Sequence, residues 1–457
     1  MAQQDEQVDV VVIGMGPGGE EVAGKLAEAG LTVVGVEREL VGGECPYWGC
    51  VPSKMMIRGS NLLAEARRID GVAGSATVAP DLAPVAQRIR AEATDDWDDQ
   101  VAADRFEKKG GRLVRGSARV DGPGRVVVGD RSFAAGRGIV LASGSAPVVP
   151  PIRGLDSTPH WTNREAISAK RAPASLVVLG GGSIGLELAQ MFARFGSEVS
   201  VVESLDRLLG PEEPEASALV TEALEKDGIS VHTGEQAVQV EREGDATVVT
   251  MKDGTTARGT ELLVSVGRHA RVAELGLDSI GLDPTAKAVE VDEWMRAATG
   301  VWAIGDVTGV GMFTHMAMYQ AGIAIADILD RRGEPADYRG LSRVTFTDPE
   351  VGSVGMTEKA ARDEGLDVRV GVAKVQSSAR GWIHGPGGNG IIKLVADAGQ
   401  GVLVGATSAG PVGGEVLSML TLAVHARVPV ATLRTMVYAY PTFHRGVLDA
   451  LGDLDTR

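Results

Sequence analysis

Short apolar runs alternate along the chain with longer stretches of helical spacing. Residues 9–13, Asp-Val-Val-Val-Ile, form a β-rich run that ends at Gly14. Residues 20–29 then have the apolar spacing of a helix, and residues 32–36 form a second β-rich run that ends at Glu37. The pattern therefore predicts a strand, a helix and a strand in one βαβ unit.

The same unit occurs a second time further along the chain. Residues 175–179 are an apolar run that leads into Gly180, and a helical stretch is followed by a strand over 198–202 that ends at Glu203. Counted from the first glycine of each copy, glycines at offsets 2, 5 and 16 and an acid at offset 23 coincide. Because a tight turn arising by chance would not repeat in this register, the pattern predicts two related domains.

The residues that repeat are those needed to bind a dinucleotide. The first glycine permits a tight turn, the second lets a pyrophosphate approach backbone N–H groups, and the third lets the helix pack against the strand. Glu37 and Glu203 would accept hydrogen bonds from adenosine ribose hydroxyls. The Glu203 carboxylate would also repel a 2′-phosphate, which favours NADH over NADPH, and Arg207 would partly offset that repulsion.

Composition and charge restrict the class of protein. The 457 residues are 44% hydrophobic and include 61 glycines, which fits a globular chain of about three domains. The formal net charge of −16 argues against nucleic acid as a partner. No apolar run approaches the roughly 18 to 20 residues of a membrane-spanning helix, and residues 1–7 lack a secretion signal. We therefore expect a soluble, cytoplasmic protein without a membrane partner.

Only two cysteines occur, Cys45 and Cys50, and they lie shortly after the first acid. Two are too few for a disulfide scaffold, and a closed zinc site would need two further ligands nearby, so we predict no metal centre. The surrounding segment 42–54, Gly-Gly-Glu-Cys-Pro-Tyr-Trp-Gly-Cys-Val-Pro-Ser-Lys, resembles the redox-disulfide motif of the class I pyridine nucleotide-disulfide oxidoreductases. This family includes dihydrolipoamide dehydrogenase, glutathione reductase and mercuric reductase. The resemblance covers nearly the whole chain through segments 140–145, 264–268, 302–306 and 346–350.

The resemblance implies that electrons pass from NADH through FAD to the cysteine pair. By position, Cys50 would be the charge-transfer thiolate beside the flavin, and Cys45 the interchange thiol that meets the acceptor. A helix N-terminus and a nearby cation would lower the pKa of both thiols. Lys54 matches the family lysine near the flavin and would form an ion pair with Glu187.

The resemblance also assigns residues to each cofactor. FAD would occupy the first unit, with Asp306 reaching its ribityl chain, and NADH would occupy the second. The residues expected at FAD are Gly14, Gly16, Gly18, Gly19, Glu37, Arg38, Gly43, Lys54, Gly116, Ser143, Gly144, Asp306 and Thr314. Those expected at NADH are Gly180, Gly182, Ile184, Gly185, Glu203, Val238 and Gly267.

The expected fold class is α/β, with two Rossmann-like dinucleotide-binding domains and an α+β C-terminal dimerisation domain. The domain boundaries would be 1–147 for the first part of the FAD domain, 148–272 for the NAD domain, 273–340 for the second part of the FAD domain and 341–457 for the interface domain. More locally, we expect helices in 55–110, short strands in 111–139, a linker at 146–151 and a flexible loop without chemistry at 381–390.

The chain departs from the family near its C-terminus. Disulfide reductases of this family carry His-Pro-Thr followed by a glutamate, a dyad that the interface domain donates to the cysteines of the partner subunit. Here Tyr440 occupies the histidine position and Arg445 the glutamate position, which predicts slow dithiol oxidation. Mercuric reductases resemble the chain in having this tyrosine, but they end in a cysteine pair that is missing here. If the segment is helical, His444 shares a face with Tyr440, either as a relocated base or as an ordinary surface histidine.

Three functions are consistent with these residues. The first is an FAD-dependent NADH oxidoreductase, a homodimer with shared active sites, whose disulfide reduces a specialised small-molecule or protein disulfide or a sulfur-containing metabolite. The second is a reductase of quinones, metal ions or oxygen. The third is a non-catalytic FAD-binding redox sensor, which leaves the reactive thiols unexplained. Residues around the cysteines are bulkier and more polar than is usual in the family, and would either narrow access to Cys45 or offer a stacking surface to a planar acceptor: Glu44, Pro46, Tyr47 and Trp48.

Overall fold

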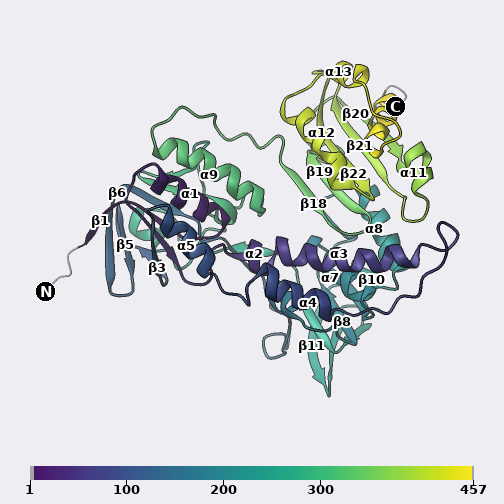
Figure 1. The fold of residues 1–457 in the computed structure, drawn as a ribbon, viewed down its shortest axis with the longest axis horizontal. Coiled ribbons are helices and arrows are strands. Elements are labelled where there is room, and N and C mark those ends of the chain that lie inside the picture. The colour runs from purple at the N-terminus through teal and green to yellow at the C-terminus, as the bar shows by residue number, and fades with distance from the viewer. Residues whose placement is uncertain (1–4, 455–457) are drawn as a thin grey trace. The chain divides into compact units, whose positions relative to one another are not determined.

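The computed structural model describes residues 5–454, which form two compact units. The first unit contains residues 5–52, 87–148 and 268–337, and the second contains residues 53–86, 149–267 and 338–454. Each unit therefore combines segments that lie far apart in the sequence, as the mixed colours within each part of the ribbon show (Figure 1).

An eight-stranded sheet forms the centre of the first unit. Its parallel neighbours, in order, are β17 (Val301–Ala303), β6 (Arg131–Leu141), β1 (Glu6–Ile13), β2 (Val33–Glu37) and β3 (Arg112–Arg115). The antiparallel strands are β16 (Arg296–Ala298) on β17, β5 (Arg125–Val128) on β6 and β4 (Ala118–Val120) on β5. The end of β1 and all of β2 are buried, as expected for parallel strands covered on both faces.

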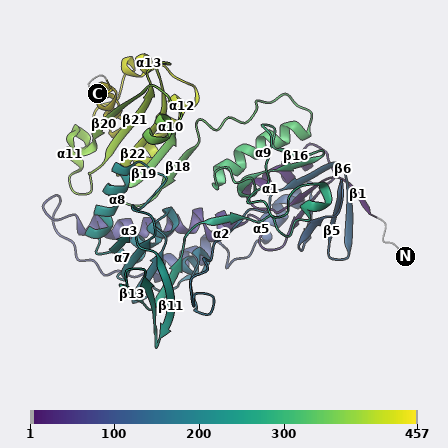
Figure 2. The same cartoon turned by 180° about the vertical axis from the view of Figure 1, so that it is seen from behind.

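Helices of the first unit cover this sheet. In sequence order they are α1 (Pro17–Glu28), α2 (Glu44–Trp48), the π-helix Ile89–Ala93, α5 (Gln100–Lys108), the 3-10 helices Leu277–Ile280 and Gly305–Thr308, and α9 (Thr314–Ile328). The helices α1 and α9 pack side by side although they come from opposite ends of the unit's sequence (Figures 1 and 2). The expected first βαβ unit is therefore present as β1, α1 and β2.

The second unit holds three sheets. A parallel sheet has the order β10 (Ser230–Thr233), β9 (Glu198–Glu203), β8 (Ser175–Leu179) and β14 (Glu261–Val264). An antiparallel sheet is formed by β11 (Ala237–Glu243), β12 (Ala246–Met251) and β13 (Thr256–Gly259). A five-stranded antiparallel sheet has the order β18 (Ser342–Thr345), β19 (Glu350–Gly355), β22 (Val402–Gly410), β21 (Ile391–Asp397) and β20 (Val368–Lys374).

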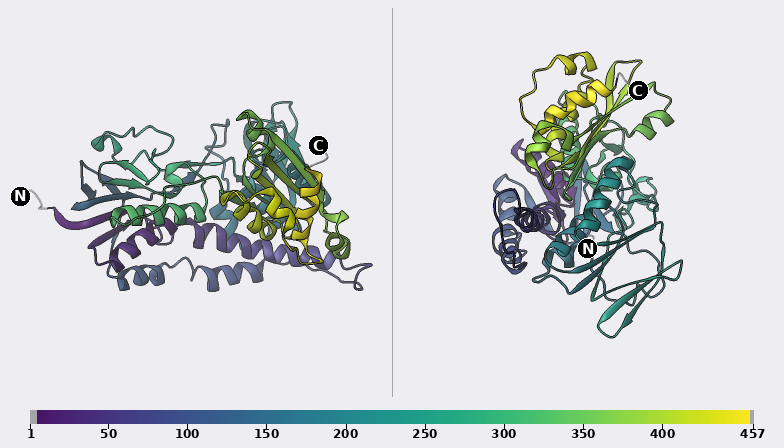
Figure 3. Two further views of the ribbon diagram at one scale, coloured as in Figure 1. Left: turned by 90° about the horizontal axis from the view of Figure 1, so that it is seen from above. Right: turned by 90° about the vertical axis from the view of Figure 1, so that its right-hand side faces the viewer.

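Helices of the second unit belong to two groups. The part that contains the four-stranded parallel sheet carries α3 (Cys50–Arg67), which begins in the first unit, together with α4 (Ala83–Arg88), α6 (Asn163–Ser168), α7 (Ser183–Arg194) and α8 (Pro214–Lys226). The C-terminal part carries α10 (Glu358–Asp363), the 3-10 helix Val375–Ser377, α11 (Ala379–His384), α12 (Gly413–His425), α13 (Val430–Thr435), the 3-10 helix Phe443–Arg445 and α14 (Gly446–Asp453). In that part α12 and α14 pack against the five-stranded sheet, where the yellow helices lie beside green strands (Figure 3).

The two parallel sheets share one strand order, because β6, β1, β2 and β3 correspond to β14, β8, β9 and β10. This confirms the α/β class with two Rossmann-like domains and an α+β C-terminal domain. Within residues 5–454, no helix combines the length and apolar character needed to cross a bilayer.

The segment 146–151, expected as a linker, contains the point after Val148 where the chain passes from the first unit to the second. It begins in the strand β7 (Ser145–Pro147), which pairs antiparallel with β15 (Arg268–Ala270). One local expectation is wrong for part of its length. The segment 381–390, expected as a loop, begins inside α11, which Ser378 caps by accepting a hydrogen bond from the Gly381 amide. In both cases a pairing or capping partner, rather than the local composition, decides the backbone conformation.

Candidate functional site

The glycine turn after β1 has the form that a pyrophosphate site requires. Gly14 adopts φ +96°, and a Cβ on it would lie 2.3 Å from the Ala142 carbonyl oxygen, so only glycine fits. A Cβ on Gly16 would meet nothing within 4 Å, which leaves open space beside the turn. A Cβ on Gly19 would lie 2.0 Å from the Gly14 oxygen, so this glycine permits close packing of α1 on the turn. The open space and the start of α1 together fit a bound phosphate group.

The glycine turn after β8 repeats this arrangement. Gly180 adopts φ +105°, and a Cβ on it would lie 2.5 Å from the Ser265 oxygen. Gly182 again faces open space, and a Cβ on Gly185 would lie 2.4 Å from the Gly180 oxygen. Each glycine of the second copy therefore meets the same physical constraint as its counterpart, and both turns fit a dinucleotide.

The two acids that close the second strands are held in the same way. Glu37 accepts hydrogen bonds from the Met15 amide at 2.7 Å and from the Glu39 amide at 2.8 Å. Glu203 accepts from the Gly181 amide at 2.6 Å and from the Leu205 amide at 2.7 Å. In each copy one carboxylate oxygen binds the glycine turn and the other binds the loop after the strand. The carboxylates are therefore fixed beside the turns, where a ribose would lie.

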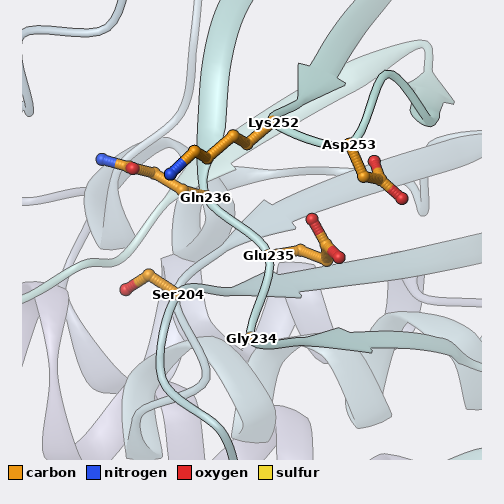
Figure 4. A pocket seen from close by; sticks show the side chains of 6 residues that line it. All are labelled: Ser204, Gly234, Glu235, Gln236, Lys252 and Asp253. Atoms are coloured by element: carbon orange, nitrogen blue, oxygen red, sulfur yellow. The ribbon is translucent and has the colours of Figure 1, made fainter.

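A cavity of about 410 Å³ opens next to Glu203 (Figure 4). The Ser204 hydroxyl lies 3.2 Å from the Glu203 carboxylate, and the Glu235 amide donates to the Glu203 carbonyl at 3.0 Å. In Figure 4 the side chains of Ser204, Gln236 and Lys252 point to one side of the cavity, whereas the carboxylates of Glu235 and Asp253 point to the other. These residues follow three different strands, which is why the sequence analysis named none of them.

Arg207 forms hydrogen bonds within its own loop. Its guanidinium donates to the backbone carbonyls of Leu209 at 3.4 Å, Gly210 at 2.6 Å and Glu212 at 2.8 Å. The side chain therefore holds its own loop and has few donors left for a 2′-phosphate. That Arg207 partly offsets the repulsion at Glu203 therefore stays a prediction.

The two cysteines lie at the starts of consecutive helices. Cys45 is in the first turn of α2, Cys50 is the first residue of α3, and both are free thiols. Gly43, which precedes α2, adopts φ +65°, and a Cβ on it would lie 2.8 Å from the Cα of Gly16. The cysteine segment is thus packed directly on the glycine turn of the first copy.

A threonine from a distant part of the chain joins the cysteines. Thr314, the first residue of α9, has its hydroxyl oxygen 3.3 Å from the sulfur of Cys50. It also hydrogen-bonds Cys45, whose sulfur is within hydrogen-bonding reach of Cys50. Thr314 was expected at FAD on the basis of the family resemblance, and its contact with both thiols was not anticipated.

The acidity of the cysteine pair differs from the expectation. The hydrogen bond with Cys50 and burial raise the pKa of the Cys45 thiol and outweigh the hydrogen bond from Thr314, which lowers it. Negative charge on Cys50 acts in the same direction, since one thiolate disfavours loss of the second proton. The expectation of a lowered pKa is therefore wrong for Cys45.

Lys54 forms the ion pair that was expected. Its Nζ lies 2.8 Å from Oε2 of Glu187, which is buried on α7, and 4.5 Å from the centre of the Phe346 ring. The other carboxylate oxygen of Glu187 accepts from the Phe346 amide at 2.8 Å. Lys54 lies one helical turn after Cys50 on α3, so this contact fixes its position on that helix. Phe346 had been noted only as part of a family segment.

A buried polar seam continues from this pair along α3 and α7. Arg194 donates to Asn61 at 2.7 Å and forms ion pairs with Asp227 at 2.8 Å and Asp348 at 2.7 Å. Arg68 forms a second ion pair with Asp348 at 2.7 Å. Below, "the α3–α7 seam" means Lys54, Asn61, Arg68, Glu187, Gln190, Arg194 and the Phe346–Asp348 segment that they hold.

Asp306 is held by residues of the strand pair β7 and β15. Its carboxylate accepts from the Ser145 hydroxyl at 2.5 Å, and Arg268 donates to the same hydroxyl at 2.8 Å. Ser143 donates to the Arg271 carbonyl at 2.8 Å, and Arg38 forms an ion pair with Glu274 at 2.9 Å. Among the other residues predicted to bind a cofactor, three are glycines with positive φ: Gly116, Gly144 and Gly267. Gly18 lies in the first turn of α1, and the side chains of Ile184 on α7 and Val238 on β11 are exposed.

The C-terminal segment does not have the expected helical form. Tyr440 lies in a turn and is 72% exposed, and Pro441 follows it, whose ring removes the N–H that a helix needs. The imidazole of His444 lies 3.4 Å from the Thr442 hydroxyl, and its ring centre is 6.3 Å from that of Tyr438. Tyr440 and His444 therefore do not share a helix face, and that expectation is wrong.

Comparison with known proteins agrees with this geometry. The family model described as pyridine nucleotide-disulphide oxidoreductase matches residues 8–321, and its dimerisation domain matches residues 341–451. A dihydrolipoyl dehydrogenase of Chlorobaculum tepidum is 34% identical over 98% of this chain and 97% of its own length. A mercuric reductase of Staphylococcus aureus is 31% identical over 97% of this chain and 82% of its own length.

Solved structures show the same fold. An HOCl-induced flavoprotein disulfide reductase from Escherichia coli, solved as a Cu(II) complex, superposes with a TM-score of 0.86 at 25% identity over 97% of this chain and 99% of that one. Within residues 5–454, no group of three or more His, Cys, Asp or Glu side chains is arranged to hold a metal ion. From the family models and the full-length relatives, the chain belongs to the pyridine nucleotide-disulphide oxidoreductases, FAD-dependent enzymes that use a pyridine nucleotide.

Proposed function

We propose that the chain is an NADH-dependent flavoprotein whose Cys45–Cys50 disulfide passes electrons to a specialised disulfide or other sulfur-containing acceptor. The observation that carries this proposal is the cysteine pair, packed on the first glycine turn and hydrogen-bonded to Thr314. In this proposal residues 1–147 and 273–340 form the FAD domain, 148–272 the NAD domain and 341–457 the interface domain. We also propose a cytoplasmic location, because two cysteines are too few for the disulfide scaffold of a small secreted domain.

The residues around the cysteines divide the chemistry between the two sulfurs. Bound FAD supplies the transfer of two electrons from the nicotinamide to the disulfide. In this proposal Cys50 is the thiolate after reduction and accepts a hydrogen bond from the Thr314 hydroxyl, 3.3 Å from its sulfur, whereas the raised pKa of Cys45 favours its protonated form. Cys45 must lose that proton before it can attack an acceptor disulfide. The proposed reaction therefore depends on a proton acceptor near Cys45.

The nicotinamide preference follows from Glu203 and Arg207. Because Glu203 is held in place by two backbone amides, it cannot swing away from a 2′-phosphate. Arg207, which follows Glu203 by four residues, is hydrogen-bonded to carbonyls of its own loop. Both facts favour NADH, whose free 2′-hydroxyl can donate to the carboxylate. The cavity lined by Ser204 and Gln236 would then take the adenosine end of the nucleotide.

The acceptor would meet the cysteines at a subunit interface. The chain carries the dimerisation domain of its family, and we propose a homodimer in which the partner's Tyr440 and His444 lie near Cys45. Tyrosine is a weak base at neutral pH, so the acceptor should be one that reacts without strong base catalysis. Small disulfides with an acidic thiol leaving group, and reactive sulfur compounds, satisfy this condition.

A panel of acceptors tests the proposal directly. The wild type and Cys45→Ser are assayed with NADH and, in turn, aromatic and aliphatic disulfides, a quinone, Cu(II), Hg(II) and oxygen. We expect a disulfide to be the best acceptor and Cys45→Ser to lose that activity by at least a hundredfold. Reduction of the flavin by NADH, followed by its absorbance, should remain fast in both proteins. A best acceptor that Cys45→Ser still reduces at the wild-type rate would refute the relay through the disulfide.

Metal-ion reduction is a second candidate because of specific relatives. The E. coli neighbour is described in complex with Cu(II), and relatives at 31–32% identity are described as mercuric reductases. In this candidate the metal ion is a substrate that meets the two thiols, and either Cys45→Ser or Cys50→Ser would abolish its reduction. If Cu(II) or Hg(II) turns over faster than every disulfide in the panel, this function replaces the first.

A further inference from the structure

A short segment near the cysteine motif has an unusual backbone. Asp95, Asp96 and Trp97 adopt φ values of 47°, 56° and 60° in succession. Single aspartates visit this left-handed region, but it is uncommon for a bulky residue such as tryptophan, and each occurrence costs of order 1–3 kcal/mol. Contacts elsewhere must therefore hold the segment in place.

The contacts made by Trp97 lead to the residues between the two cysteines. Its ring is stacked on that of Trp48, with centroids 5.2 Å apart and planes 19° apart. Its indole N–H donates to the carbonyl of Tyr47 at 3.3 Å. Tyr47 and Trp48 are the last two residues of α2, which begins beside Cys45, and only Gly49 separates Trp48 from Cys50. Trp97 therefore holds the chain between the two sulfurs.

The opposite end of the segment is anchored as well. Arg90 forms an ion pair with Asp96 at 2.5 Å, and its guanidinium carbon lies 5.8 Å from the Trp97 ring. The Asp96 amide donates to the Arg90 carbonyl at 2.7 Å, and the Thr94 hydroxyl donates to the Ile89 carbonyl at 3.0 Å. The positive φ values thus turn the chain out of the π-helix so that Trp97 reaches α2.

We propose that Trp97 is a positioning residue for the redox pair, which fixes the segment between Cys45 and Cys50 and so favours closure of their disulfide. This proposal rests on the proposed function, in which the pair cycles between dithiol and disulfide. A segment held by the Trp48–Trp97 stack loses less conformational freedom when the sulfurs join than a free segment would. Removal of the Trp97 ring therefore weakens the disulfide relative to the dithiol.

The equilibrium to be measured is a balanced exchange with glutathione. One S–S bond forms between Cys45 and Cys50, and the S–S bond of glutathione disulfide breaks. The two electrons pass from the pair of thiols to glutathione disulfide, and the two protons end on two glutathione molecules. The probe is a series of anaerobic buffers of defined ratio of glutathione to glutathione disulfide, with FAD-loaded protein and no nicotinamide. The fraction oxidised is read by thiol alkylation and mass spectrometry.

Trp97→Ala and Trp97→Leu are compared with the wild type in these buffers. An aromatic pair contributes about 0.5–1.5 kcal/mol beyond burial, so we expect the equilibrium constant for disulfide formation to fall roughly three- to tenfold in both variants. A tenfold change corresponds to about 30 mV in the reduction potential. Trp161→Leu is the matched control, because it removes an aromatic contact with Phe192 at 5.8 Å in the other unit and should leave the constant within twofold.

A double-mutant cycle with Trp48→Ala isolates the stack. In that background the effect of Trp97→Leu on the equilibrium constant should be smaller than in the wild type, because the stack is already lost and the hydrogen bond to the Tyr47 carbonyl is the contact to α2 that the substitution still removes. Wild-type constants in both Trp97 variants, or equal effects of Trp97→Leu with and without Trp48, would overturn the inference and leave the proposed function standing. A wild type that forms no Cys45–Cys50 disulfide in any buffer would overturn both.

Discussion

The two acids that end β2 and β9 accept hydrogen bonds from equivalent backbone amides, although they lie in different parts of the chain. A carboxylate that receives two N–H groups is fixed in position as well as in charge. At Glu203 we expect this fixed charge to discriminate against NADPH, because a change of side-chain rotamer cannot relieve its repulsion of the 2′-phosphate.

Removal of this charge should relax the nicotinamide preference. We expect the wild type to prefer NADH over NADPH by at least roughly tenfold in kcat/KM, which corresponds to about 1.4 kcal/mol. In Glu203→Gln the ratio should fall below about threefold, because the amide no longer repels the 2′-phosphate. Glu235→Gln, which removes another carboxylate from the same cavity, should keep the wild-type ratio. Equal efficiency with both nucleotides in the wild type would contradict the assignment.

Two substitutions in the C-terminal segment test the role of the family's histidine and glutamate, which this chain lacks. Tyr440 is exposed in the single chain, and the Arg445 guanidinium forms a 3.5 Å ion pair with Asp449. Tyr440→His with Arg445→Glu should raise dihydrolipoamide turnover at least tenfold, within the range of 10² to 10⁴ that acid and base catalysis supplies. Stopped-flow reduction of the flavin by NADH should be unchanged and serves as the control. A wild type that already turns over dihydrolipoamide at about 10 to 10³ per second would defeat this argument.

At the scale of elements, α3 and α7 are joined by a repeating polar contact. Lys54 and Asn61 lie seven residues apart on one face of α3, Arg68 follows directly after the last residue of this helix, and Glu187 and Arg194 have the same seven-residue spacing on α7. The partners match in order, because Lys54 meets Glu187 and Asn61 meets Arg194. The α3–α7 seam thus sets the register of the lysine that follows the redox cysteines.

Asp348 closes the far end of this seam, and its removal should destabilise the protein. Burial raises the pKa of Asp348, but the guanidinium groups of Arg194 and Arg68 lower it by more, so the net shift is downward. Asp348→Asn removes one of the two carboxylates that pair with the buried Arg194 and should lower the free energy of unfolding by about 3 kcal/mol at neutral pH, the lower end for breaking a buried ion pair. The measurement is the melting temperature of the FAD-loaded protein.

The pH dependence of that loss has a defined sign. A carboxyl whose pKa is depressed in the folded state contributes stability above its unfolded pKa, and the contribution disappears as the pH falls through the folded value. The difference in melting temperature between the wild type and Asp348→Asn should therefore be constant from pH 5 to 8 and shrink below about pH 4. Asp283→Asn, at an exposed turn aspartate, should shift the melting temperature little at any pH.

At the scale of the whole molecule, the dimerisation domain displays large apolar side chains. Val437 is 94% exposed, and an isolated soluble domain rarely shows several such residues together. The exposed large apolar side chains within residues 341–451 are Trp382, Ile383, Leu422, Met436, Val437 and Tyr440. A second copy of the chain is the partner that the family's dimerisation domain implies.

A charge at Val437 should therefore weaken the dimer. We expect Val437→Asp to raise the dissociation constant of the dimer at least tenfold, because a buried unpaired carboxylate costs far more than about 1.4 kcal/mol. Light scattering over a dilution series measures this constant. Val101→Asp is the matched control, since Val101 is 68% exposed on α5 outside that domain. A wild type that is monomeric and fully active would rule out shared active sites.

Much of the fold follows from the sequence because its signals are local. A glycine turn, the helix after it and the acid that ends the next strand lie within 24 residues, and each is fixed by backbone geometry that acts over that distance. The repeat therefore predicted both βαβ units, and the cysteine spacing together with the resemblance predicted the redox motif and the Lys54–Glu187 pair.

Other features were decided only by tertiary structure, because they depend on partners far away in the chain. Ser145–Pro147 is a strand because it pairs with β15. Tyr440 and His444 do not share a helix face, because the chain at Pro441 is not helical. Arg207 was committed to three carbonyls of its own loop, and Thr314 reached both cysteines from α9. Trp97 met Trp48 only because three residues adopt positive φ. The sequence by itself thus determined which chemistry each local segment supports, whereas long-range hydrogen bonds and packing, which no local pattern encodes, decided which side chains are free to carry it out.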